Sequence, residues 1–165
     1  MRQLLLIRHA KSDWSSGVAD HERPLNARGR RDAAALGEWL QTHAGPVDRV
    51  IVSTALRTRL TWEIASSALR DVPPVEFRDE IYEAHWTEVL DVARALGDEH
   101  RVILIGHNPG LEDLATRLAA TSSATLADLE EKFPTSAIAR LEFDGSWADL
   151  GPSGAHLVEF AVSRG

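Results

Sequence analysis

Three short runs of branched apolar residues constrain the fold of this chain more than any other feature. The runs are continuous rather than alternating, and they occupy residues 4–7, 50–52 and 102–105. Strands that are buried on both faces, as in a parallel sheet, have this pattern. Apolar residues at helical spacing fill the segments near and between the runs, namely residues 27–43, 54–69, 87–96 and 109–120. Strands that alternate with helices predict an α/β fold.

The last third of the chain has a different pattern. Residues 136–144 approach an alternation of apolar and polar side chains, residues 145–154 carry turn signals, and residues 156–162 again have strand character. We therefore expect an edge hairpin with an antiparallel member near the C-terminus, preceded by a loop with a short helix over residues 121–134. The predicted architecture is a three-layer α/β/α fold with a mostly parallel central sheet, in a single domain over residues 1–165.

Composition narrows the classes of function. The 165 residues include 18 Lys and Arg against 25 Asp and Glu, which gives a net charge of −7, and there is no Cys. This charge disfavours bulk binding to nucleic acid or to anionic membranes. The lack of Cys excludes disulfides, thiolate metal sites and a Cys nucleophile. Because there is no recognisable signal peptide and no run near the roughly 18 apolar residues of a membrane span, we expect a cytoplasmic protein.

The cations are mostly arginines, with 16 Arg and only 2 Lys. Arginine binds planar oxyanions through a bidentate fork, so this excess raises the question of an anionic ligand. A genome-wide codon bias toward Arg would produce the same composition. Position along the chain, rather than composition, has to decide between these two interpretations.

Polar residues follow each apolar run directly. In chain order they are Arg8, His9, Ser53, Thr54, Arg57, His107 and Asn108. In an open parallel sheet, ligands bind beyond the carboxyl ends of the strands. Two His and two Arg that are far apart in sequence would then converge at one edge of the sheet.

The expected helix starts point to an anion at that edge. Asn108 and Pro109 suit an N-cap and a first helical residue, which would place His107 beside free backbone N–H groups. Thr54 could cap the preceding helix, with Arg57 in its first turn, where a cation is unfavourable unless an anion lies nearby. The pattern predicts an oxyanion pocket for a phosphoryl or similar group.

Each of these residues has a plainer interpretation when it is taken alone. A single His at a strand end is more often a structural hydrogen-bonding residue, and a single Arg is usually solvated or ion-paired. Isolated carboxylates such as Glu83 and Asp13 usually lie at the surface. The convergence at three strand ends is what favours a functional site.

Five segments in order along the chain resemble the motifs of one family. They are residues 5–12 (LLIRHAKS), 23–29 (RPLNARG), 53–58 (STALRT), 106–109 (GHNP) and 133–137 (FPTSA). Together they resemble the histidine phosphatase (phosphoglycerate mutase-like) superfamily, and more specifically the SixA-type phosphohistidine phosphatases. The resemblance covers about residues 3–140, which is most of the chain.

The resemblance implies a role for each matching residue. His9 would be the nucleophile that becomes phosphorylated transiently, and Arg8, Arg57 and His107 would hold the phosphoryl oxygens. Glu83 is the candidate general acid. The candidates for substrate binding are Lys11, Ser15, Arg23 and Asn108. No metal and no cofactor is implied, because Arg and His supply the positive charge that phosphoryl transfer requires.

Two departures from the wider superfamily, at Ala10-Lys11 and at the general acid, and one inference from chain length refine the prediction. Gly-Glu usually follows the Arg-His pair, whereas Ala10 and Lys11 stand here, which disfavours a mutase and favours the SixA-type branch. The chain between Arg78 and Val102 leaves little room for a cap over the site, so we expect a shallow, open pocket. The role of Glu83 stays open, because a leaving imidazole depends less on a general acid than an alkoxide does.

The sequence therefore predicts a metal-independent phosphatase with a covalent phosphohistidine intermediate, acting on phosphohistidine in a protein. A phosphatase of small phosphate esters is the alternative, followed by a weakly catalytic, phosphate-binding regulatory module. The expected partner is a phosphorylated protein or a small phosphate ester, with no nucleic acid and no membrane. A monomer is favoured.

Overall fold

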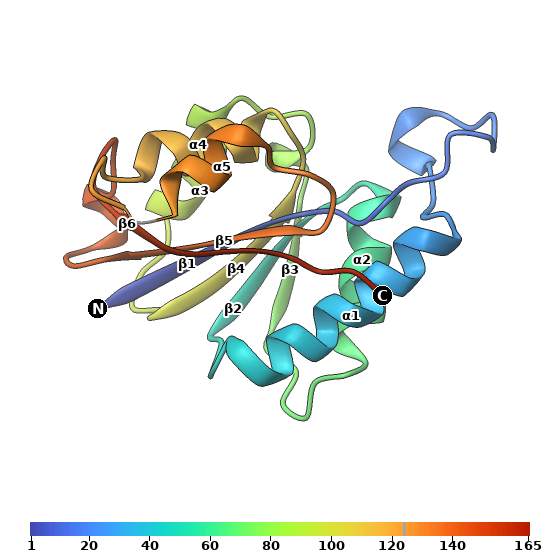
Figure 1. Ribbon diagram of the computed structural model, residues 1–165, viewed down its shortest axis with the longest axis horizontal. Coiled ribbons are helices and arrows are strands. Elements are labelled where there is room, and N and C mark those ends of the chain that lie inside the picture. The colour runs from blue at the N-terminus through green and yellow to red at the C-terminus, as the bar shows by residue number, and fades with distance from the viewer. Residues whose placement is uncertain (124) are drawn as a thin grey trace.

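A six-stranded sheet forms the centre of the molecule (Figure 1). The computed structural model describes residues 1–123 and 125–165; Ala124, within the expected loop over residues 121–134, lies outside the described residues. The strand order is β3-β2-β4-β1-β5-β6. The bounds are β1 (Arg2–Arg8), β2 (Arg49–Ser53), β3 (Val75–Arg78), β4 (Arg101–Gly106), β5 (Ala137–Phe143) and β6 (His156–Val162).

The sheet is mixed, which corrects the expectation of a mostly parallel one. Strands β1 to β4 are parallel, whereas β5 is antiparallel to β1 and β6 is antiparallel to β5. Two successive helices, α4 (Gly110–Leu118) and α5 (Leu126–Glu131), separate β4 from β5. They return the chain to the edge that it left, where the Ser136 amide donates to the Arg8 and His9 carbonyls. The expected edge hairpin is formed by β5 and β6.

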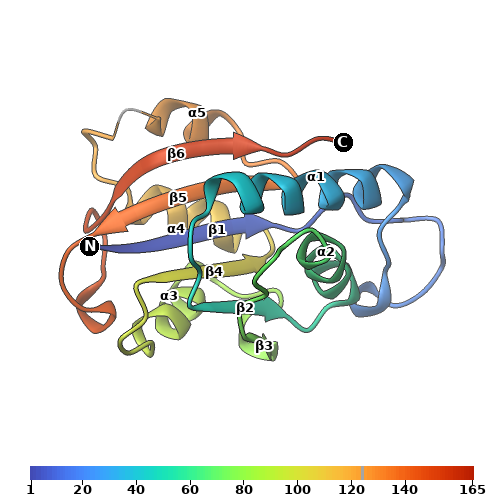
Figure 2. The same ribbon diagram turned by 90° about the horizontal axis from the view of Figure 1, so that it is seen from below.

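Helices cover both faces of the sheet, so the predicted three-layer α/β/α class is confirmed (Figure 2). One face carries α1 (Ala27–His43) and α2 (Leu56–Ser66), and the other carries α3 (Trp86–Arg94), α4 and α5. Short 3-10 turns are η1 (Asp20–Glu22), η2 (Asp79–Ile81) and η3 (Trp147–Asp149). None of the helices in the described residues has the length and apolar character that crossing a membrane requires.

The apolar runs are buried on both sides, as their continuous pattern predicts. Along β1, Leu4 and Leu6 join the cluster under α3 and α4, while Leu5 and Ile7 join the cluster under α1 and α2. The third strand in chain order, β3, lacks such a run. It lies at the sheet edge, and its Val75 and Phe77 side chains are exposed. No continuous apolar run therefore predicts this strand.

The two expected helix caps differ from the structure, one wholly and one in position. Helix α2 begins at Leu56 with Ala55 as its N-cap, because the Thr54 hydroxyl instead contacts Asp79 and His21. Helix α4 begins at Gly110 with Pro109 as its N-cap. Asn108 lies one residue before this N-cap, but its Oδ1 still accepts from the Glu112 amide in the first turn of α4 at 3.3 Å. Its Nδ2 donates to the Phe133 carbonyl oxygen at 2.7 Å.

Candidate active site

The strand order places the carboxyl ends of β1, β2 and β4 side by side. Arg8 pairs with Gly106 across the sheet, and the His9 amide donates to the Gly106 carbonyl at 3.1 Å. The rings of His9 and His107 lie 5.3 Å apart between centroids. The structure therefore brings together the two histidines that the sequence separates by almost a hundred residues.

The His9 ring is buried and its tautomer is fixed. Nδ1 lies 2.7 Å from the Ala10 carbonyl oxygen. Because a carbonyl oxygen can only accept, Nδ1 carries the hydrogen and Nε2 keeps its lone pair. Burial lowers the pKa of His9 well below 6.5; the Ala10 hydrogen bond opposes this shift, and His107, Arg57 and Arg8 add to it. At neutral pH the ring is thus uncharged, with a nucleophilic Nε2.

His107 is held by the chain that follows β2. Its Nε2 lies 2.8 Å from the Ser53 hydroxyl oxygen, which itself accepts a hydrogen bond from the Ala55 amide. When the Ser53 hydroxyl donates to Nε2, the ring hydrogen of His107 is on Nδ1, the tautomer that can donate to an oxyanion. Burial lowers the pKa of His107 to about 3; Arg57 acts in the same direction and Asp20 in the opposite one.

Arg8 and Arg57 each donate hydrogen bonds to the protein from the terminal nitrogens of the guanidinium. Arg8 Nη1 donates to the Phe133 carbonyl at 3.3 Å. Arg57 donates from Nη1 to the Asp20 carbonyl at 2.8 Å and from Nη2 to Asp20 Oδ2 at 3.1 Å. Burial lowers the pKa of Arg8, an effect that Glu112 opposes, yet a guanidinium stays protonated at neutral pH. Two cations therefore lie next to the neutral His9 ring.

Four buried side-chain atoms have no hydrogen-bond partner among the described residues. They are Arg8 Nε, Arg57 Nε, His107 Nδ1 and Ser136 Oγ. A buried donor without a partner costs about 1–3 kcal/mol, so such groups are rare in folded proteins. All four residues are at the carboxyl edge of β1, β2 and β4. The two Arg Nε atoms are N–H donors, and His107 Nδ1 is a donor in the tautomer whose Nε2 accepts from Ser53. This arrangement suits an oxyanion.

The remaining predicted site residues differ in their surroundings. Arg23 is buried, with Nη1 donating to Ser12 Oγ at 2.6 Å and Nε to Asp20 Oδ1 at 3.1 Å, under the ring of Trp14. Ser15 is exposed, and its hydroxyl donates to Asp13 at 2.6 Å. Asn108 bonds to Phe133, as described above.

Glu83 and Lys11 are not joined to the histidines by any contact of the described side chains. Glu83 is exposed, and its backbone has a φ of 50°. Lys11 is half-buried. Glu83 directly follows Tyr82, whose ring packs edge-on against His107 at 5.5 Å.

Sequence reasoning missed Asp20 and Tyr82. Asp20 accepts from Arg57 and Arg23, and it also accepts from the Tyr82 hydroxyl at 2.6 Å. The Tyr82 hydrogen bond is the main cause that lowers the pKa of Asp20 to about 2, and Arg23 and Arg57 add to it. The sequence offers one signal for Asp20: it lies three residues before Arg23, which is the first residue of a matched segment.

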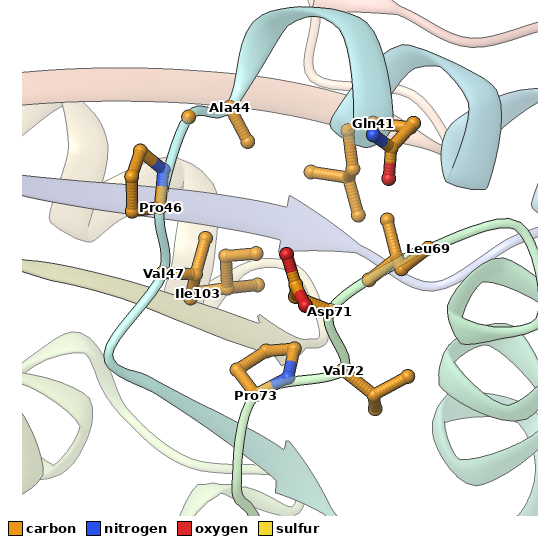
Figure 3. A pocket seen from close by; sticks show the side chains of 11 residues that line it. Gln41, Ala44, Pro46, Val47, Leu69, Asp71, Val72, Pro73 and Ile103 are labelled. Carbon is orange, nitrogen blue, oxygen red and sulfur yellow. The ribbon is translucent and has the colours of Figure 1, made fainter.

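Two hollows of the surface are lined by other residues. A groove of about 440 Å³ runs along the amino ends of the strands, between the end of α1 and the chain before β3 (Figure 3). Its lining includes Gln41, Val47, Leu69, Val72 and Ile103. A second pocket, of about 670 Å³, is lined by His21, Thr54, Arg59, Trp62, Glu63 and Phe77. Neither is lined by His9 or His107. Within the described residues, no group of three or more His, Asp or Glu side chains could hold a metal ion.

The comparisons with known proteins show the family of this chain. Residues 4–101 match the model of the histidine phosphatase superfamily (branch 1). An uncharacterised protein of Mycobacterium tuberculosis is 40% identical over 162 residues, which cover 96% of this chain and 100% of that protein. The chain therefore belongs to the histidine phosphatase superfamily. It is a phosphatase, a hydrolase.

The solved structures most useful for comparison come from the SixA branch. A candidate phosphohistidine phosphatase SixA from Nakamurella multipartitia has a TM-score of 0.86 and 35% identity, with 98% of this chain and 96% of that chain covered. A protein histidine phosphatase SixA complexed with tungstate has a TM-score of 0.79 at 23% identity, with coverages of 97% and 96%. The predicted SixA-type resemblance is thus confirmed.

Proposed function

We propose that this chain is a metal-independent phosphatase that removes the phosphoryl group from phosphohistidine in a protein, through a covalent phosphohistidine at His9. The observation that carries the proposal is the set of three buried, unpaired nitrogens, on Arg8, Arg57 and His107, beside the unprotonated Nε2 of His9. A phosphoryl group would give each donor an acceptor and would place phosphorus before the nucleophile.

In the first step, the lone pair of His9 Nε2 attacks phosphorus while the bond from phosphorus to the substrate imidazole breaks. The transition state of phosphoryl transfer is loose, so catalysis consists mainly of positioning and charge stabilisation. Arg8, Arg57 and His107 would donate to the three non-bridging oxygens. The departing imidazole takes up a proton and leaves as a neutral ring.

In the second step, water attacks the phosphoryl group on His9. The bond between phosphorus and Nε2 breaks, inorganic phosphate leaves, and His9 returns to its neutral form. One water is consumed for each phosphohistidine that is hydrolysed, and the proton that water loses balances the one that the leaving imidazole gains. Two easier displacements replace one direct attack by water.

A small phosphate ester is the alternative substrate. Its alkoxide leaving group would need a general acid, and Glu83 is the candidate because it follows Tyr82, which packs against His107. The solved neighbours of the same fold include a candidate alpha-ribazole-5'-phosphate phosphatase from Escherichia coli, at a TM-score of 0.66 and 17% identity. This likeness concerns the fold alone.

A competition assay tests the choice of substrate. A peptide that carries phosphohistidine should be hydrolysed with a higher kcat/KM than any member of a panel of small phosphate esters, and the activity should survive complete chelation of metals. A higher kcat/KM for one of the esters would favour the alternative substrate. Loss of activity with the chelator, restored by a metal, would overturn the metal-independent mechanism.

A further inference from the structure

We propose that Asp20 is a positioning residue, which holds the Arg57 guanidinium by its end so that the Nε side of the group faces the bound phosphoryl group. The inference rests on the proposed function, since it assigns the residue that orients one of the proposed phosphate ligands. It goes beyond that function because neither the sequence motifs nor the predicted roles include Asp20.

The first support comes from which nitrogens Asp20 binds. Its carbonyl oxygen accepts from Arg57 Nη1 and its Oδ2 accepts from Arg57 Nη2. These are the two terminal nitrogens, so Asp20 occupies the end of the guanidinium fork. The Nε hydrogen stays unpaired and buried, and the second hydrogen of Nη2 lies on the same side. Two parallel N–H groups are thus left for an oxyanion, in the geometry that Arg uses for bidentate binding.

The second support is that Asp20 joins separate parts of the site. Its Oδ1 accepts from Arg23 Nε and its Oδ2 accepts from the Tyr82 hydroxyl. Tyr82 in turn packs edge-on against His107 at 5.5 Å. One carboxylate therefore ties η1 to the start of α2 and to the turn that follows η2. Movement of Asp20 would break its hydrogen bonds to Arg57 and to Tyr82, which packs against His107, at the same time.

The third support is the charge state of Asp20. The hydrogen bond from Tyr82, with those from Arg23 and Arg57, lowers the pKa of this carboxyl to about 2. It therefore has no proton to donate near pH 7, which excludes the role of general acid. Both carboxylate oxygens are directed at donors of the protein. These properties are those of a group that orients its neighbours and does not take part in the proton transfers.

The test compares Asp20→Asn with Glu22→Gln, a matched control on the same 3-10 turn whose carboxylate pairs with His21 and with neither arginine. Asp20→Asn should lower kcat/KM by about 10- to 100-fold, because a misplaced ligand has a cost of this order, whereas the control should change it by less than about twofold. Asp20→Asn should also weaken the binding of inorganic phosphate by about tenfold in calorimetry. This second measurement needs no turnover, so it tests Asp20 even if the proposed substrate is wrong.

A double-mutant cycle separates positioning from a merely structural role. In an Arg57→Ala background, Asp20→Asn should lower kcat/KM by less than about threefold, since its main target is gone. An equal loss in both backgrounds, or an unchanged phosphate affinity in the single variant, overturns the inference. If Asp20→Asn does not fold, Tyr82→Phe replaces it: this variant keeps the carboxylate, removes one of its donors, and should weaken phosphate binding by about two- to threefold. Unchanged binding in Tyr82→Phe would then count against the proposal.

Discussion

The two ends of the sheet differ in whether their buried polar groups have hydrogen-bond partners. The amino end carries the groove of about 440 Å³, whose lining is mostly apolar and whose Gln41 side chain already accepts from the Arg70 amide. The carboxyl end carries both histidines and, among the described residues, all four buried side-chain atoms without partners. The comparison teaches that unsatisfied donors mark the site of a small anion better than a largely apolar groove does.

The largest effect is expected from the nucleophile at the carboxyl end. His9→Ala should abolish turnover, by at least about 10⁴-fold, because no other described group can form the covalent intermediate. Rapid quench of the wild type with a phosphorylated substrate should trap an acid-labile, alkali-stable phosphoprotein that the variant does not form. Retained turnover in a folded His9→Ala variant would contradict the mechanism.

The next effect concerns the unpaired donors. Arg57→Ala should lower kcat by about 10²–10³-fold, as the loss of one preorganised donor to a developing oxyanion does. Arg8→Ala should act similarly, and both should be measured by steady-state kinetics on the same substrate. A loss of less than about tenfold in both variants would show that the unpaired donors do not bind the phosphoryl group, and the contrast between the two ends would fail.

The stability of the protein should depend on pH through the same end. The pKa of His107 is about 3 in the folded chain and 6.5 when unperturbed, so the unfolded chain binds more protons between these values. Stability therefore falls as the pH decreases from 6.5 toward 3, by roughly 2–3 kcal/mol at pH 4.5 from this group. Urea unfolding at pH 7 and pH 4.5 measures it, and His107→Gln should make the dependence less steep without removing it, because the buried His9 also has a lowered pKa. An equally steep dependence in that variant would contradict the assignment.

A smaller effect separates the two substrates. Glu83→Gln should lower kcat/KM for a phosphate ester by about 10- to 100-fold, because an alkoxide needs a proton as it leaves, but by less than about threefold for a phosphohistidine peptide. Parallel assays on one preparation measure both values. Equal losses on the two substrates would remove Glu83 from the role of general acid.

The smallest effect is expected at the amino end. Val72 lines the groove there and is exposed, so Val72→Ser should leave kcat/KM within about twofold of the wild type and stability within about 0.5 kcal/mol. Kinetics and urea unfolding check this. A loss as large as that of Arg57→Ala would show that the groove takes part in the reaction, and it would break the comparison.

Much of the fold and part of the site could be predicted from local patterns. The continuous runs identified β1, β2 and β4, and the rule that ligands lie beyond the carboxyl ends of strands placed His9 near His107. Edge strand β3 could not be found in this way, because its exposed Val75 and Phe77 form no continuous run. The sequence predicts a mostly parallel sheet, whereas β5 is antiparallel to β1 and β6 is antiparallel to β5. The direction of β5 depends on how α4 and α5 return the chain, which no local pattern shows.

The sequence does not predict the roles of Asp20 and Tyr82 in the site, for a different reason. Their contact joins residues 62 positions apart, from η1 and from the turn after η2. Neither residue stands in a periodic pattern, and neither follows one of the three apolar runs. Only the packing of those two segments over the start of α2 brings the carboxylate to Arg57, and no local pattern encodes that packing.

The position of β1 between β4 and β5 has a consequence for how the site moves. This strand is hydrogen-bonded on both sides, and its Leu5, Leu6 and Ile7 side chains are fully buried. Amide protons of such a strand exchange with solvent only when most of the molecule opens. His9 follows this strand directly, whereas Asp20 lies on a short turn outside the sheet. We therefore expect amide exchange to be slowest in the strand that carries the nucleophile and faster in the turn that carries Asp20.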